Sequence, residues 1–121
     1  MNSNDLKKLA AKDQDVSSIP EWMIGEAILI RLVEQKFIDL FSQGKMNGTA
    51  HTCVGQEFSA TAVAGQLMDV DWVTSNHRCH GHFISKTKNW RGLIDELMGL
   101  ESGVCKGIGS SRHCLCYCSR N

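Results

Sequence analysis

The sequence lacks the features that would place it in several specialised classes of protein. Its 13 Lys and Arg residues balance its 13 Asp and Glu residues, so no net charge attracts a nucleic acid or a membrane surface, and we expect neither as a partner. The longest aliphatic run, residues 27–30, is far shorter than the roughly 20 residues of a membrane-spanning helix. Residues 1–15 are polar and carry acids, which matches neither a secretory signal nor a transit peptide. We therefore expect a cytoplasmic protein.

The cysteines do not have the arrangement of a disulfide-stapled protein. Three stand singly and three crowd the end of the chain: Cys53, Cys79 and Cys105, then Cys114, Cys116 and Cys118. This distribution favours a reducing compartment over a secreted scaffold.

Zinc binding is the main structural alternative for these side chains. The competent ligands are His77, Cys79, His80, His82, His113 and the three C-terminal cysteines. Neither cluster contains the Cys-x2-Cys or His-x3-His pairs of structural zinc sites. We therefore assign no metal ligand and keep a small zinc-stabilised interaction module as the second hypothesis for the function.

Apolar periodicity predicts a long amphipathic helix near the start of the chain. Ser18 is its predicted cap, Pro20 lies in its first turn, and Gly44 ends it after Gln43. Its apolar stripe comprises Leu29, Val33, Phe37, Leu40 and Phe41, widened by Ile30 and Ile38. A helical adaptor that docks a partner through this stripe is a third hypothesis.

Two further helices and one strand are predicted downstream. Residues 56–68 are rich in alanine and glycine, which suits close packing against another helix or subunit. Residues 90–98 have the i, i+3, i+4, i+7 pattern and end near Gly99 or Gly103. Residues 69–75 predict one brief strand.

These elements are too few for a complete parallel sheet, although the Ala/Gly helix and Gly-rich loops are typical of α/β proteins. We therefore predict an incomplete, mostly helical part of an α/β domain over residues 18–113. Residues 1–17 are expected to form a flexible leader, and residues 114–121 an aberrant Cys-rich tail.

The densest set of reactive side chains is the segment 76–82, Asn-His-Arg-Cys-His-Gly-His. Arg78 offers a planar fork of donors for phosphate oxygens, and imidazoles donate or shuttle protons near neutral pH. A helix that begins near His80 would add its free amides to an anion site. The alternative is a loop with solvent-exposed histidines. His51 precedes the second helix, where it can lie at the entrance of a binding site or have only a structural role, packed against neighbouring residues.

Taken in order, the segments resemble a known family. They are 41–45 (FSQGK), 48–51 (GTAH), 54–57 (VGQE), 71–73 (DWV), 75–82 (SNHRCHGH) and 103–107 (GVCKG). From about residue 21 to residue 113, the chain resembles the start of the α-subunit, or α-type half, of the thiamine-diphosphate-dependent 2-oxo acid dehydrogenases.

The resemblance implies an α/β thiamine-diphosphate-binding fold, with thiamine diphosphate and Mg2+ as cofactors. It implies oxidative decarboxylation of a 2-oxo acid, such as pyruvate or a branched-chain analogue, with acyl transfer to a lipoyl arm. The implied partners are a β-type subunit or domain and a lipoyl-bearing acyltransferase.

The resemblance also implies roles for individual residues. Arg78 would grip the cofactor diphosphate, and His77 stands where many members have a tyrosine that binds the same group. His51 matches a catalytic histidine near the thiazolium ring, and His80 matches the histidine beside the arginine, which we also count as catalytic. His113 matches a histidine after the Gly-rich loop, as a further cofactor-binding residue. His82 has a weaker match.

The sequence departs from the family pattern in two respects. The Gly-Asp-Gly motif and downstream Asn that hold Mg2+ in the family do not occur in it. After Gly109 the expected Gly-rich continuation is replaced by the Cys-rich tail, from which we expect a frame change or a truncated gene model. We therefore expect negligible activity from the chain alone.

Overall fold

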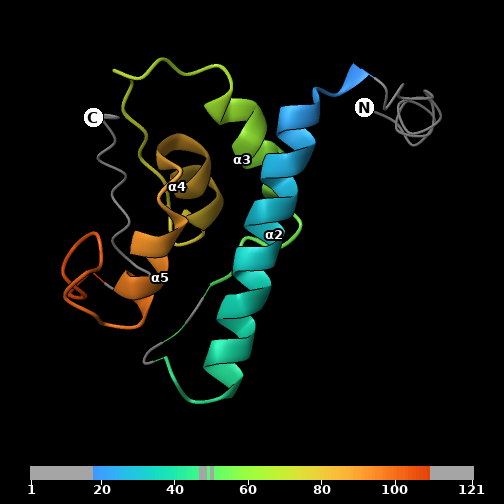
Figure 1. The fold of residues 1–121 in the computed structure, drawn as a ribbon. Helices are drawn as coiled ribbons and strands as arrows, with labels where there is room; N and C mark the ends of the chain where they lie inside the picture. The colour runs from blue at the N-terminus through green and yellow to red at the C-terminus, as the bar shows by residue number, and fades with distance from the viewer. Residues whose placement is uncertain (1–17, 47–48, 50, 110–121) are drawn as a thin grey trace, which may run out of the picture.

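The computed structural model describes residues 18–46, 49 and 51–109. Within these ranges the chain forms four helices and no strand: α2 (Glu21–Ser42), α3 (Glu57–Ala64), α4 (His80–Thr87) and α5 (Trp90–Leu97). The long α2 helix packs against α3 and α4, and α4 also packs against α3 and α5. Figure 1 shows α2 alone along one side, with the three short helices gathered beside it. No helix in this part of the chain is long and apolar enough to cross a membrane.

Helix α2 begins and ends close to the predicted positions. Pro20 caps it with a φ of −59°, and its carbonyl accepts the first helical N–H bonds, so the start lies at Glu21 and not at Ser18. A proline fits there because its fixed φ suits the first turn and its missing N–H would have no helical partner. Gly44 has a φ of +67°, the left-handed conformation that ends many helices.

The buried face of α2 is rotated from the predicted stripe. It consists of Glu26, Ala27, Ile30, Val33, Glu34, Phe37 and Leu40. Phe41 and Ile38 were predicted to be buried but are 46% and 48% exposed. Ile30 and Phe37 are instead fully covered, because α3 and α4 lie on that side of the helix. The buried face therefore carries two carboxylates among its apolar side chains.

Helices α3 and α4 meet through small residues. A Cβ atom at Gly81 would lie 2.9 Å from the Ala60 Cβ and 3.3 Å from the Cys53 Sγ. Real Cβ atoms almost never lie within 3.0 Å of another atom, so a glycine is needed for α4 to approach α3 at Ala60. The predicted use of small side chains for close packing agrees with this contact. Helix α3 ends at Ala64, earlier than the sequence suggested.

The predicted strand over residues 69–75 is wrong. The segment is irregular, and no strand in the described ranges lies beside it. A strand needs a partner for its backbone groups, and here the Lys86 ammonium donates instead to the carbonyl oxygens of Met68 and Asp69. The helical part of the predicted fold class is confirmed, whereas its α/β sheet is not shown and stays a prediction.

Helix α5 follows the sequence prediction, whereas α4 is a helix beyond the two that were predicted after α2. A helix does begin at His80, and α5 covers the apolar pattern after Trp90. Lys88 separates the two with a φ of +61°, and the Asn89 side chain caps α5 by accepting the Gly92 N–H at 3.0 Å. The predicted leader, residues 1–17, and the tail, residues 114–121, lie outside the described ranges.

Candidate functional site

Two of the predicted site histidines lie together. The rings of His51 and His77 meet edge to face with their centroids 4.7 Å apart. His51 is half-buried in the loop before α3, and His77 is exposed in the loop before α4. The fold thus brings together two side chains that are 26 positions apart. One comes from the loop before α3 and the other from the loop before α4, and these two loops form a loop pair.

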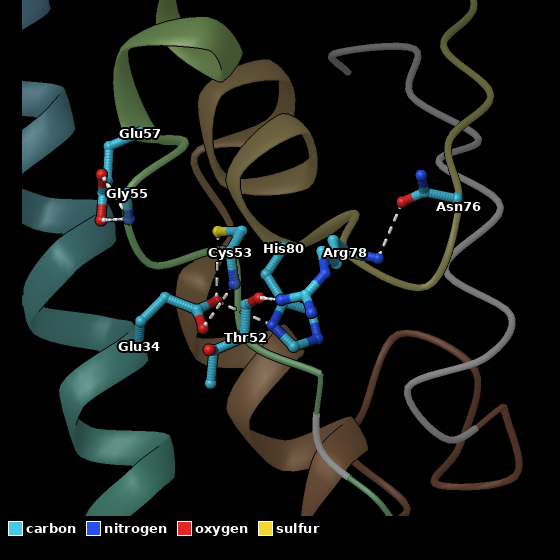
Figure 2. A network of polar contacts seen from close by, with 8 residues as sticks. All are labelled: Glu34, Thr52, Cys53, Gly55, Glu57, Asn76, Arg78 and His80. Atoms are coloured by element: carbon cyan, nitrogen blue, oxygen red, sulfur yellow. Dashed lines mark hydrogen bonds and ion pairs between the residues drawn. The ribbon is translucent and has the colours of Figure 1, made fainter.

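Arg78 lies beside them on the surface. Its guanidinium donates to the carbonyl of Thr52, and its backbone N–H donates to the Asn76 side chain at 2.9 Å (Figure 2). A guanidinium carries five N–H donors, so one contact with Thr52 fixes its position and leaves others for an anion.

A polar cavity of about 280 Å³ opens next to this arginine. It is lined by Cys53, Gln56, Ser59, Ala60, Arg78, Gly81 and His82. The N-terminus of α4 begins at its edge, with His80 as the first helical residue. The positive end of a helix dipole favours negative charge at such a terminus. Together with the guanidinium, it favours an anionic group in this cavity.

His80 lies elsewhere, in the interior. It is fully buried, and its Nδ1 is 2.7 Å from the Oε1 of Glu34 on α2. The same carboxylate accepts the Cys53 N–H at 3.1 Å through Oε2 and contacts the Cys53 Sγ at 3.4 Å through Oε1. Figure 2 shows Glu34 reaching from α2 to both side chains. His80 is therefore connected to the site through its buried contact with Glu34 and does not line the solvent-exposed side of the site.

Cys53 is held as a thiol by this environment. Burial, and then the nearby Glu34 carboxylate, raise its pKa to about 12. Only the thiolate is a good nucleophile, so Cys53 is not a candidate nucleophile at neutral pH.

We accordingly expect cysteine labelling to divide the thiols by exposure. Cys105 is exposed, whereas Cys53 and Cys79 are buried. Among these three described thiols, Cys105 should be modified first with a maleimide at neutral pH, and the two buried thiols only when the protein unfolds. Peptide mass spectrometry after a short pulse measures this directly. Equal modification of Cys53 and Cys105 in the folded chain would contradict the buried position of Cys53.

A second carboxylate supports the loop that carries His51. The Arg31 Nε donates to Glu57 at 2.5 Å, and the Gly55 N–H donates to both Glu57 oxygens at 3.0 Å. The hydrogen bond from Arg31 is the main reason why the Glu57 pKa falls from 4.5 to about 2. Because the folded-state pKa is lowered, this stabilisation is present above pH 4.5 and is lost as the pH falls towards 2.

Sequence reasoning missed the two carboxylates that organise the loops, Glu34 and Glu96. Glu96 is buried on α5 and accepts the N–H groups of Cys105, Gly107 and Gly109 at 2.6 to 2.9 Å. The signal in the sequence was an acidic residue within an apolar helix stripe. Such a residue predicts a buried carboxylate with hydrogen-bond donors around it, because acids are rarely buried without a partner.

The remaining predicted side chains give no metal site in this structure. Within residues 18–46, 49 and 51–109, no group of three or more His, Cys, Asp or Glu side chains could hold a metal ion. His113 and the C-terminal cysteines lie outside these ranges, so the role predicted for His113 stays a prediction. The zinc-module hypothesis has no support from the described residues.

Comparison with known proteins agrees with the family resemblance of the sequence. The family model described as "Dehydrogenase E1 component" matches residues 26–121. The chain is 41% identical over 92 residues to the alpha subunit of acetoin:2,6-dichlorophenolindophenol oxidoreductase from Bacillus subtilis, covering 76% of this chain and 28% of that protein.

Similar proteins also include pyruvate dehydrogenase E1 alpha subunits. The Rhizobium meliloti subunit is 35% identical over 73% of this chain and 25% of its own length, and the mitochondrial subunit of Schizosaccharomyces pombe is 34% identical over 71% and 21%. The chain thus spans about a quarter of the length of the relatives it matches. Because one of these relatives is mitochondrial, the cytoplasmic location stays a prediction.

A match over most of the chain identifies this protein as a member of the dehydrogenase E1 component family, related to its alpha subunits.

Proposed function

We propose that this chain supplies one wall of the thiamine diphosphate site of an E1 component. The observation that carries the proposal is the position of Arg78, which Thr52 holds at the rim of a polar cavity beside the α4 N-terminus. A diphosphate needs a surface that is cationic and rich in hydrogen-bond donors. Arg78 and the α4 N-terminus form such a surface. The residues therefore fit the anionic end of the cofactor.

The side chains divide into roles within this proposal. Arg78 binds the diphosphate through N–H groups that Thr52 does not use. His77 and His51 lie beside it, where an imidazole can donate a hydrogen bond to a phosphate oxygen or orient a carbonyl substrate. When bound, thiamine diphosphate supplies the electron sink for cleavage of a carbon–carbon bond next to a carbonyl. The chain itself contributes charge compensation, orientation and exclusion of water.

Mg2+ and the protein partners belong to the same proposal. The sequence has no Gly-Asp-Gly motif, so we assign no Mg2+ ligand to this chain. A β-type subunit or domain would complete the site, and a lipoyl-bearing acyltransferase would accept the acyl group. The domain covers residues 18–113 in this proposal, as the sequence predicted.

A 2-oxo acid such as pyruvate is the first candidate substrate. An acyloin is the second, because the chain has 41% identity with a subunit of an acetoin oxidoreductase and 35% with the bacterial pyruvate dehydrogenase subunit. Both substrates have a carbonyl next to the bond to be cleaved, so the same cofactor serves either.

A segment exchange tests the proposal. Residues 21–109 would replace the matching segment in the Bacillus subtilis alpha subunit and, separately, in the Rhizobium meliloti subunit. Each hybrid is then combined with its natural partner subunit and assayed for thiamine diphosphate binding and for turnover of acetoin and pyruvate. We expect cofactor binding in at least one folded hybrid, and the host that retains activity indicates the substrate class. Two folded hybrids that assemble but bind no cofactor would refute the proposal.

A further inference from the structure

Glu34 is a fully buried carboxylate that links two separate segments of the site. Through one oxygen it accepts the Cys53 backbone N–H, and through the other it contacts His80 Nδ1 at 2.7 Å. Transferring a charged group from water into the protein interior is costly. Buried ionic groups can often be replaced by apolar side chains of similar volume. Packing alone therefore does not account for a glutamate at this position, among Ile30, Val33 and Phe37.

The two linked segments are the ones that hold the surface side chains. Cys53 directly follows Thr52, whose carbonyl accepts the Arg78 guanidinium. His80 is two residues after Arg78 and begins α4. One carboxylate thus fixes both the acceptor of the arginine contact and the backbone from which the arginine extends (Figure 2). His51 and His77, which pack against each other, are the next residues outward in the same two loops.

We propose that Glu34 is a positioning residue, which acts through Cys53 and His80 to hold Arg78 and the His51–His77 pair in the geometry that receives a diphosphate. This inference rests on the proposed function for its ligand, whereas the positioning itself can be tested without one. In this proposal His80 also positions its neighbours and does not contact the substrate.

The proposal specifies a tautomer for His80, because the donor and acceptor roles in its contact with Glu34 depend on which ring nitrogen carries the proton. A carboxylate that accepts from both Cys53 and His80 requires the proton on Nδ1. The other ring nitrogen, Nε2, is buried and has no hydrogen-bond partner in the part of the chain that the structure describes. The carboxylate is therefore the group that orients the ring, supported by the Phe37 ring, whose centroid lies 5.3 Å away.

Histidine ring NMR on the full 121-residue chain gives the first test. Long-range 1H–15N spectra should show His80 with a proton on Nδ1. A His80 ring protonated only at Nε2 in the unaltered chain would overturn the proposal.

The second test compares Glu34→Gln with Glu34→Asp. A glutamine amide has one acceptor oxygen and one donor nitrogen, so it cannot accept from both Cys53 and His80. One of the two donors must therefore lose its acceptor, so in this variant we expect Cys53 amide exchange to accelerate roughly tenfold or more, or the His80 ring proton to move from Nδ1 to Nε2. The His51 and His77 ring signals should shift as well. Aspartate keeps both acceptor oxygens at a shorter reach, so it should give intermediate exchange and retain the Nδ1 proton.

Glu96→Gln is the matched control, because Glu96 is a similarly buried carboxylate that accepts backbone N–H groups of another loop. It should leave the Cys53 and His80 signals unchanged. The proposal is overturned if Glu34→Gln leaves them unchanged too, or if Glu96→Gln shifts them equally. If the glutamine variant does not fold, the aspartate variant decides, and unchanged Cys53 exchange together with unshifted His51 and His77 signals there overturns the proposal.

Failure of the proposed function would look different. In that case Cys53 and His80 still respond to Glu34→Gln, while the cofactor affinity of a segment-exchange hybrid is independent of Arg78.

Discussion

Replacing Arg78 with alanine is expected to weaken thiamine diphosphate binding by roughly 10- to 100-fold in a segment-exchange hybrid. Hydrogen bonds to charged groups contribute about 1.5–3 kcal/mol, and about 1.4 kcal/mol corresponds to tenfold in affinity. The Thr52 carbonyl holds the guanidinium in place, so little ordering accompanies binding and most of this energy reaches the ligand. Calorimetric titration with thiamine diphosphate in excess Mg2+ measures the change.

Two matched variants serve as controls for this experiment. Arg78→Lys keeps the charge but not the planar fork, so its affinity should lie between those of the alanine variant and the unaltered hybrid. Arg91→Ala removes an exposed arginine that lies over the Trp90 ring on α5, away from the cavity, and should leave affinity unchanged. If Arg78→Ala binds the cofactor as tightly as Arg91→Ala, Arg78 does not hold the diphosphate.

Replacing Phe37 with alanine should have the largest effect on stability. Phe37 has no exposed surface and packs against the His80 ring. Truncating a buried phenylalanine destabilises a protein by about 3–5 kcal/mol, through lost burial and the cavity left behind. Because small domains have total stabilities of only about 5–15 kcal/mol, the variant should unfold at far lower urea or lack a folded baseline. Urea titration of the full chain, followed by far-UV circular dichroism, measures this.

Phe41→Ala is the control on the same helix. Phe41 is one turn further along α2 and 46% exposed, so its truncation should have a much smaller effect, within about 1 kcal/mol. The sequence pattern placed both phenylalanines on the apolar stripe. Equal losses for the two variants would mean that the buried face of α2 differs from the one described here.

The sequence was sufficient for features that depend on local chemistry. Pro20 marks the start of α2 and Gly44 marks its end. A proline favours the first turn of a helix and a glycine adopts the left-handed conformation that ends one, whatever surrounds them. The apolar spacing after Trp90 specified α5, and the order of the loop motifs specified the family. Arg78 and His77 were predicted to bind an anion because their side-chain types are those that bind phosphate.

The rest depended on contacts between distant residues. Residues 69–75 have the composition of a strand, but a strand forms only against a partner, and none lies beside them in the described structure. The buried face of α2 was set by the positions of α3 and α4, which exposed Phe41 and covered Ile30.

By itself the sequence determined which side chains are available to bind an anion, because residue type decides charge and donor geometry. Only the tertiary structure decided their arrangement. It paired His51 with His77 and joined Glu34 to His80 across 46 positions. No local pattern encodes such pairs, because a buried carboxylate finds its donors only when separate segments pack around it.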